Sequence, residues 1–264
     1  MDLHHKMRKV AEFSNQYIAQ VLKPEVKTNS LLNDWFEAFF WFAGRAFYRG
    51  RRDELSSQFL NGAKHGILNF LENKKNIERL IKLKEAGFLD DSKSWEGSPI
   101  VKEIRSLAID KENNRRPVNN INDRKLLRGA LKFLLELEDS DYNVTKYTND
   151  KINNGNTSEL YKEILDIDYY GDKTACFYLR DMICIFELPM RESDYEFIQP
   201  IDTWVKQVSE RIGLISRDES KRPNNIVKQK INEACIKFKI SPIEYNQGAW
   251  YIGKKGLLDE LFPR

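Results

Sequence analysis

Two short stretches of this sequence place reactive side chains where helices are expected to begin. In YYGDKTACFYLRDM (residues 169–182), Lys173 follows a turn at Gly171 and lies in the first turn of a helix. With the helix before it, this stretch forms a helix, a hairpin and a second helix over residues 158–187. Backbone N–H groups at such a turn have no partner inside the helix, so they can seat a phosphate oxygen. The pattern predicts a phosphate contact beside a lysine.

The second stretch, IQPIDTWVKQV, places Asp202 just after Pro200 at the start of another helix. The amide groups at a helix N-terminus favour an ionised carboxylate there. Each stretch also has a purely structural interpretation. Gly171 can be a plain turn residue with Lys173 an exposed charge, and Asp202 can be a helix N-cap. What favours a functional role for both stretches is their order along the chain, in which a hairpin lysine is followed by an aspartate at a helix start.

The elements around these residues are predicted to be helices, so the expected fold class is all-α. Segments with helical periodicity are separated by short polar or glycine-containing links, and no alternating strand pattern or internal repeat is found. The stretch with the most aromatic residues, residues 34–48, is expected to be a core helix with Asp34 as N-cap and Trp41 in the core. Other helices are predicted at residues 53–71, 76–89, 99–109, 122–138, 158–167, 172–188, 202–212, 225–239 and 242 onward, the third of these with Ser98 as N-cap and the fourth with an Asn cap.

One long polar stretch, residues 139–156, is rich in Asn and Asp and keeps no apolar periodicity. It is predicted to be a loop. The last helix is expected to begin with Ser241 and Glu244 in capping-box spacing around Pro242.

Composition limits the functional classes. With 43 Lys and Arg against 40 Asp and Glu, the net charge is +3, so a nucleic-acid surface must come from local clustering. The chain begins without an apolar run typical of a signal peptide, and its most apolar stretch is too short to span a membrane. Cys176, Cys184 and Cys235 are too few and scattered for a disulfide framework, a zinc site or an iron–sulfur cluster. We therefore expect a cytoplasmic protein without a metal.

The two stretches together resemble the helix-hairpin-helix DNA glycosylase superfamily. Its members carry a hairpin close to L-P-G-V-G-x-K-T-A, followed by V-D-T-H-V. This chain has IDYYGDKTA at residues 167–175 and IDTWV at residues 201–205. The second glycine, the Lys-Thr-Ala run and the Asp-Thr pair match, whereas Tyr169 replaces the first glycine and Trp204 the usual histidine. Because glycine adopts a positive φ at little cost and tyrosine does not, Tyr169 leaves room for a shifted turn.

The resemblance implies a base-excision-repair enzyme. Lys173 would be the Schiff-base nucleophile at the sugar C1′, and Asp202 would stabilise the cationic sugar and help deprotonate the amine. A lysine needs its pKa lowered toward about 7 or 8 for this role, which burial and a helix N-terminus favour. The hairpin residues Tyr169, Tyr170, Gly171, Asp172 and Thr174 would bind the DNA backbone. The order of reaction would be base flipping, displacement of the base and β-elimination.

The resemblance also implies the arrangement of the chain and its partners. Residues 1–55 and 200–264 would form one helical lobe and residues 56–199, with the hairpin, the other, and Lys173 and Asp202 would face each other across the cleft. The partner would be duplex DNA with a damaged base, bound by a monomer near the prokaryotic nucleoid. No cofactor would be required, although a monovalent cation could bind at the hairpin. The separation of 29 positions from Lys173 to Asp202, and the lack of iron–sulfur cysteines, look most like the archaeal-type 8-oxoguanine glycosylase and lyase branch.

Weaker features complete the sequence prediction. A flipped base needs an aromatic platform and an amide to read its edge, and Gln247, Trp250 and Trp204 are candidates. Basic clusters at residues 49–52, 113–117, 123–128 and 221–230 could contact phosphates, but for each of them a solvated helix face or loop is favoured. Two alternatives stay open: a glycosylase for another modified base, and a DNA-binding protein that keeps the hairpin without catalysis.

Overall fold

The computed structural model describes residues 1–263 except residues 26, 48–52 and 108–119. In these described residues every regular element is a helix and no strand is present, so the prediction of an all-α protein is confirmed. None of the described helices is long and apolar enough to cross a membrane. The basic clusters at residues 49–52 and 113–117 lie outside the described residues.

The chain divides into two compact units, each described here by itself. Unit 1 contains residues 1–27, 155–161 and 175–264, and unit 2 contains residues 28–154 and 162–174. Two helices, α12 (Thr157–Leu165) and α13 (Asp172–Phe186), include residues of both units. The lobes expected at 1–55 with 200–264 and at 56–199 stay a prediction, since the compact units divide the chain at other residues.

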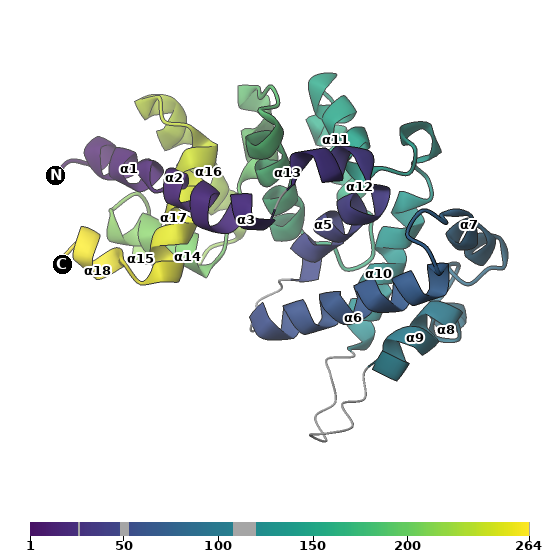
Figure 1. Cartoon of the computed structure of the whole chain (residues 1–264). Helices are drawn as coiled ribbons and strands as arrows, with labels where there is room; N and C mark the ends of the chain where they lie inside the picture. The colour runs from purple at the N-terminus through teal and green to yellow at the C-terminus, as the bar shows by residue number, and fades with distance from the viewer. Residues whose placement is uncertain (26, 48–52, 108–119, 264) are drawn as a thin grey trace. The chain divides into compact units, whose positions relative to one another are not determined.

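Unit 2 is built around α5, the most aromatic of its helices (Figure 1). Phe36, Phe39, Phe42 and Phe47 are at most 1% exposed, and Trp41 is buried as predicted. Asp34 caps this helix by accepting hydrogen bonds from the N–H groups of Phe36 and Glu37. The other helices of this unit are α4 (Thr28–Asn33), α6 (Asp53–Leu71), α7 (Glu78–Glu85), α8 (Ser92–Glu96), α9 (Pro99–Leu107), α10 (Ile121–Leu134), η2 (Glu138–Ser140) and α11 (Val144–Asn153), with α5 at Trp35–Phe47.

The loop predicted over residues 139–156 is wrong, because α11 occupies most of it. Asn143 is the N-cap of this helix, and its side chain accepts hydrogen bonds from the N–H groups of Thr145 and Lys146. Thr145 and Thr148 are fully buried along with Val144 and Ile152. The buried face is therefore partly made of threonines, which an apolar periodicity does not count.

The expected helix starts are mostly confirmed. Ser98 accepts a hydrogen bond from the Val101 N–H, with Pro99 as the first helical residue, and Ser241 accepts one from the Glu244 N–H in the same way. The cap of α10 is different from the one expected. Its N-cap is Asn120, so the helix begins at Ile121, one residue before the predicted start at residue 122.

Unit 1 joins the two ends of the chain (Figure 1). Its core is formed by side chains of α1, α14, α16 and α17. Gly248 allows α17 to approach α1, because a Cβ at this position would lie only 1.9 Å from the carbonyl oxygen of Val10. The helices of this unit are α1 (Leu3–Glu12), α2 (Ser14–Tyr17), η1 (Ile18–Leu22), α3 (Lys23–Glu25), η3 (Glu192–Ile198), α14 (Thr203–Arg211), α15 (Arg217–Ser220), α16 (Asn224–Phe238), α17 (Pro242–Lys255) and α18 (Leu258–Leu261).

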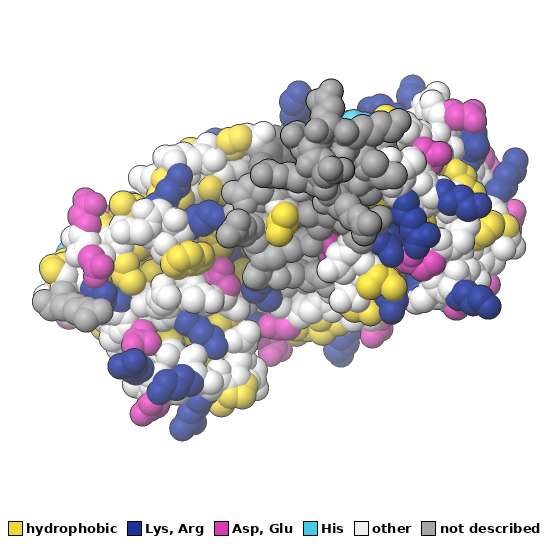
Figure 2. All heavy atoms as spheres, turned by 90° about the horizontal axis from the view of Figure 1, so that it is seen from below, with side chains coloured by type: hydrophobic (Ala, Val, Ile, Leu, Met, Phe, Trp, Pro, Cys, Tyr) yellow, Lys and Arg dark blue, Asp and Glu magenta, His cyan; other side chains and the backbone are white. Residues whose placement is uncertain are grey.

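Basic and acidic side chains are interspersed on the face that Figure 2 shows. Among the described side chains on this face, no broad area of one sign is visible.

Candidate functional site

The hairpin between α12 and α13 is a tight turn with an unusual residue at its third position. The Tyr170 N–H donates to the carbonyl oxygen of Ile167 at 3.0 Å, which closes a four-residue turn. Tyr169, the third residue, has a φ of 66°. A positive φ at this place is the geometry for which type II turns use glycine. The tyrosine that replaces the first hairpin glycine thus adopts a glycine-like backbone conformation.

The start of α13 is held by a reciprocal pair of hydrogen bonds. The Thr174 hydroxyl donates to the carbonyl oxygen of Gly171 at 2.8 Å and accepts from the Gly171 N–H at 3.1 Å. Thr174 thereby fixes the residue that precedes the helix, as the third residue of a capping box does. Gly171 itself is exposed, and its φ is not among the positive values. A Cβ there would meet no atom within 4 Å, so neither its backbone conformation nor its neighbours in the described chain require a glycine at this position.

Helix α10 positions this hairpin inside unit 2. A Cβ at Gly129 would lie 2.9 Å from the backbone nitrogen of Asp168, so glycine lets the turn lie directly on the helix. Arg128 forms an ion pair with Asp168, and the Lys125 ammonium lies 5.9 Å from the ring centre of Tyr169. One face of α10, at spacings of one, three and four residues, thus supports the turn.

The two arginines of the basic cluster at residues 123–128 are buried in ion pairs, Arg124 with Glu96 on α8 and Arg128 with Asp168 of the hairpin. The Arg124 guanidinium lies 2.8 Å from the Glu96 carboxylate. Buried guanidinium groups need such partners to offset the loss of hydration. The interpretation as an exposed face is therefore wrong for these two arginines.

Tyr170 is a core residue. It is 6% exposed, its ring stacks on Phe42 with centres 5.0 Å apart, and its hydroxyl donates to the carbonyl oxygen of Phe42 at 3.4 Å. Tyr170 therefore packs the hairpin against α5. Because its side chain is buried in this contact, it is not exposed for direct contact with DNA. Its neighbour Tyr169 is 42% exposed.

Lys173 is the second residue of α13 and is partly exposed, in unit 2. Among the described residues, no hydrogen bond or ion pair involves its ammonium group. Asp172, just before it, supplies a carboxylate in the first turn, where the helix dipole favours negative charge. The lysine is thus not held in a structural ion pair within the described chain.

Asp202 is the N-cap of α14, in unit 1. Its Oδ1 accepts a hydrogen bond from the Val205 N–H at 2.9 Å, and the side chain is half-buried. The structural interpretation of Asp202 is therefore confirmed, and one of its oxygens is committed to the cap. A role in chemistry would use the remaining lone pairs and the negative charge.

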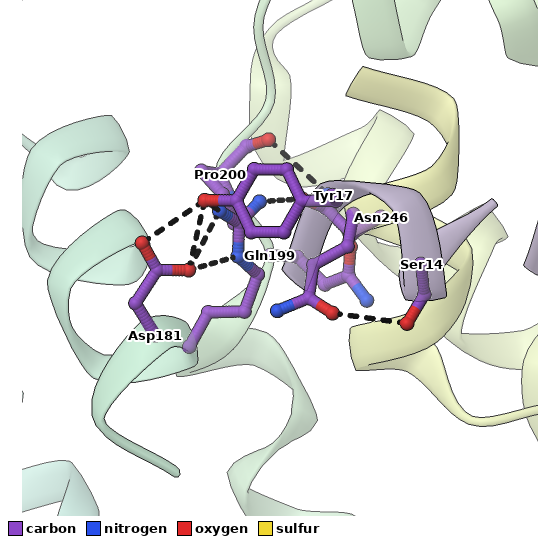
Figure 3. A network of polar contacts seen from close by, with 8 residues as sticks. Ser14, Tyr17, Asp181, Gln199, Pro200 and Asn246 are labelled. Atoms are coloured by element: carbon purple, nitrogen blue, oxygen red, sulfur yellow. Dashed lines mark hydrogen bonds and ion pairs between the residues drawn. The ribbon is translucent and has the colours of Figure 1, made fainter. Parts of the chain in front are cut away.

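A buried polar network in unit 1 fixes the segment that leads to Asp202 (Figure 3). Asn246 on α17 donates to the side-chain oxygen of Gln199 at 2.8 Å and to the carbonyl oxygen of Pro200 at 3.2 Å. Gln199 in turn donates to the carbonyl oxygen of Pro242 at 2.9 Å. These amides supply partners for backbone oxygens, which cost free energy when buried alone.

The centre of this network is an adjacent Arg180–Asp181 pair on α13, with both side chains fully buried. The Arg180 guanidinium donates to Asp181 at 2.8 Å, to Asn246 at 2.7 Å and to the Tyr17 hydroxyl at 2.5 Å, and Tyr17 also contacts Asp181. Burial alone would lower the pKa of Arg180, but the charge and hydrogen bonds of Asp181, together with the neighbouring Tyr17 and Cys184, outweigh it and the pKa is raised. The guanidinium therefore stays charged inside the protein.

Two of the predicted base-pocket residues lie beside this network in unit 1. Gln247 is fully buried and accepts a hydrogen bond from the Ser14 hydroxyl at 3.2 Å. Trp250 is half-buried and packs edge-on against Tyr17, with ring centres 5.5 Å apart. Nearby, burial raises the pKa of the Cys184 thiol, against a smaller opposing hydrogen bond from Gln247.

Trp204 lies elsewhere in unit 1, in the first turn of α14. It is 37% exposed, and its Cβ would be 2.6 Å from a Cβ at Gly253. Gly253 thus leaves room for this tryptophan against α17. Part of the Trp204 ring is therefore exposed to solvent, while its Cβ packs closely against α17.

The sequence prediction placed Lys173 and Asp202 correctly at the starts of two helices, and their roles stay a prediction, but it missed the Arg180–Asp181 network. The partners of Arg180 come from positions far along the chain, at Tyr17 and Asn246. The available signal was a charged pair inside the otherwise apolar helix ACFYLRDMICIF. Charged residues are almost never fully buried without partners, so such a pair predicts a buried network. In the described residues, no group of His, Cys, Asp and Glu side chains could hold a metal ion.

Comparisons with known proteins add little to this geometry. No family model matches the chain, and no solved structure matches it. An uncharacterized protein of Methanocaldococcus jannaschii, MJECL21, is 29% identical over 108 residues. This similarity covers 40% of the present chain and 25% of the other, so the matched region spans about a quarter of that relative's length.

Proposed function

We propose that this protein is a DNA N-glycosylase with abasic-site lyase activity, which removes an oxidised purine such as 8-oxoguanine from duplex DNA. The observation that carries the proposal is the start of α13: Lys173 follows a hairpin whose Tyr169 has a φ of 66°, the conformation for which the resembling enzymes use glycine. The chain thus has both the lysine and a turn of the kind expected in the enzymes that it resembles. The resemblance in residues 167–175 and 201–205 supports the same function.

The proposed reaction begins with a nucleotide flipped out of the duplex. The neutral amine of Lys173 attacks C1′ of the sugar, and the bond between C1′ and the base breaks with its electron pair leaving on the base. Loss of an amine proton and opening of the sugar ring give an imine. β-Elimination at C2′ and C3′ then releases the 3′ phosphate, and water hydrolyses the imine to regenerate the lysine.

The surroundings of Lys173 support this role. Its ammonium has no ion-pair partner among the described residues, so the side chain is not committed to a structural salt bridge there. Asp202 would contribute the negative charge that stabilises the cationic sugar, while its Oδ1 keeps the helix cap.

The direct test is borohydride trapping. Two duplexes, one with 8-oxoguanine and one with an abasic site, are incubated with the full chain in sodium borohydride and run on a denaturing gel. We expect a covalent adduct with both, because borohydride reduces the imine to a stable amine. Lys173→Gln should abolish the adduct, whereas Lys162→Gln, an exposed lysine on α12, should leave it unchanged.

Asp202→Asn tests the role of the carboxylate charge separately from the role of this side chain as the N-cap of α14. Asparagine is as good an N-cap as aspartate, so α14 should stay stable while the carboxylate is lost. We expect an unchanged Tm with at least a tenfold lower single-turnover rate of base release. Asp91→Asn, which alters the N-cap aspartate of α8 in the same way, is the matched control and should keep full activity.

The outcomes distinguish the alternatives left open by the sequence. An adduct with the abasic duplex but not with 8-oxoguanine would keep the lyase and point to a different base. DNA binding without an adduct on either duplex would overturn the lyase and leave a water-using glycosylase or a binding protein. Base release that persists in Lys173→Gln would favour the former.

A further inference from the structure

A buried lysine and a buried cysteine lie side by side in unit 1. The Lys228 ammonium on α16 is 3.1 Å from the Sγ atom of Cys176 on α13. Cys176 is fully buried and Lys228 is 7% exposed. Both belong to unit 1, and neither has a role in the proposed function.

The position of the Lys228 nitrogen is fixed by other contacts. It also donates to the carbonyl oxygen of Glu196 at 3.1 Å and lies 5.8 Å from the ring centre of Tyr161. The thiol contacts the same carbonyl oxygen at 3.8 Å. Two groups that are held in contact in this way react as if at very high local concentration.

We propose that Lys228 and Cys176 are an oxidation-dependent cross-linking site, at which hydrogen peroxide produces a sulfenamide bond between Nζ and Sγ. The pair combines a nucleophilic sulfur with an amine that is already in contact with it. Cysteine sulfenic acids are known to condense with a nearby nitrogen in this manner. Reaction inside the protein also keeps competing thiols and bulk water away from the sulfenic acid.

The chemistry balances with one peroxide. The thiolate of Cys176 attacks a peroxide oxygen, the S–O bond forms, and the O–O bond breaks; the leaving hydroxide takes a proton from the Lys228 ammonium and becomes water. This step leaves a sulfenic acid beside a neutral amine. The amine then attacks Sγ, the S–N bond forms and the S–O bond breaks, and hydroxide leaves with an amine proton as a second water.

The other two cysteines provide an internal comparison. Cys235 is fully buried without a hydrogen bond to a lysine among the described residues, and burial raises the pKa of its thiol to about 12. Cys184 is partly buried, and burial raises the pKa of its thiol also. Since the thiolate is the nucleophile, we expect peroxide to react first at Cys176.

The experiment uses the purified full chain, treated with hydrogen peroxide, quenched with catalase and digested without reductant for mass spectrometry. We expect a linked peptide pair joining Cys176 and Lys228, with the summed mass less two hydrogens. Dithiothreitol should return both peptides to their original masses. Because Sγ is reached only through local opening, the bond should form slowly and be limited to small oxidants.

Variants and a second readout keep the test independent of folding. Cys176→Ser and Lys228→Arg should abolish the linked peptide, whereas Cys235→Ser should retain it. The bond closes a long loop between α13 and α16, so oxidised wild type should melt roughly 5–10 °C higher than reduced protein. Cys176→Ser should show no such shift.

Two results would overturn the proposal. The first is a treated chain in which Cys176 is unmodified, or carries only a sulfinic acid, while Lys228 stays free. The second is a linked peptide that carries an additional oxygen, which would replace the S–N bond by an oxygen bridge.

Discussion

Tyr169 adopts a left-handed backbone conformation that costs an ordinary residue about 1–2 kcal/mol. A contact between its ring and the Lys125 ammonium offsets part of this cost. An exposed cation–π contact contributes roughly 0.5–1 kcal/mol. The conformation is therefore retained by a compromise between backbone strain and a side-chain contact.

A pair of glycine substitutions tests this balance. Lys239 ends α16 with a φ of 54° and is exposed, so Lys239→Gly should stabilise the protein by about 1 kcal/mol. Tyr169→Gly should give a smaller gain, within about 0.5 kcal/mol of zero, since the contact with Lys125 is lost. Urea unfolding of both variants and the wild type measures the difference. Equal gains would show that the tyrosine ring contributes nothing to stability.

The candidate site could be predicted from sequence only where the signal is local. Lys173 and Asp202 stand next to turn and cap residues, so their places at the starts of α13 and α14 follow from neighbouring letters. The network around Arg180 depends on Tyr17 and Asn246, which no local pattern links to it. Partners that come together only through the tertiary fold are not predicted by helical periodicity.

At the scale of elements, α11 shows how one polar residue can hold a helix. Asn143 is 2% exposed and uses both ends of its amide. The oxygen caps α11, and the nitrogen donates to the carbonyl oxygens of Leu31 and Leu32 at 3.0 and 3.1 Å. The residue therefore connects α11 to the end of α4 within unit 2.

Asn143→Ala is expected to destabilise the protein by about 2–3 kcal/mol. Loss of the cap costs about 1 kcal/mol, and the two carbonyl oxygens left without this donor add a desolvation cost of about 1–3 kcal/mol. Asn120→Ala is the matched control, because Asn120 is an exposed cap of α10, and its cost should be about 1 kcal/mol. Chemical denaturation with circular dichroism compares the two. A cost for Asn143→Ala no larger than the control would contradict a role beyond capping.

The helices predicted correctly are those with strong apolar periodicity. In α5 and α10 most positions on the inner face are Phe or Leu, so spacing alone predicts them. Helix α11 has few apolar residues and uses buried threonines, and its cap is an asparagine in a run of asparagines and aspartates. Asparagine, aspartate and threonine also favour loops, so only their burial in the folded protein decides between a loop and a helix.

For the whole molecule, the division into units does not follow the order of the chain. The chain passes between the units after residues 27, 154, 161 and 174, and two of these passages lie inside α12 and α13. Separate unfolding of one unit would have to break both helices. Helix formation is cooperative, so breaking them has a free-energy cost that couples the two units.

We therefore expect one cooperative unfolding transition. Calorimetry should give a van't Hoff enthalpy equal to the calorimetric enthalpy, and fluorescence and circular dichroism should give the same midpoint. Asn143→Ala in unit 2 and Arg180→Met in unit 1 should each lower that single midpoint, the latter because the buried Asp181 carboxylate loses the positive charge of the guanidinium. Two separate transitions, each moved by only one of the variants, would show independent units.

The close approach of α1 to α17 at Gly248 has a consequence for how the protein is made. Residues 1–27 are translated before their partners in unit 1, which begin at residue 155, and α17 follows about 200 residues after them. At a translation rate of roughly 5–20 residues per second, at least about ten seconds pass between the synthesis of α1 and that of α17. During this time the apolar face of α1, with Met7 and Val10, lacks its contact with α17. All of unit 2, whose last residue is 174, has been translated by then, so unit 2 can fold while α1 still lacks its contact with α17.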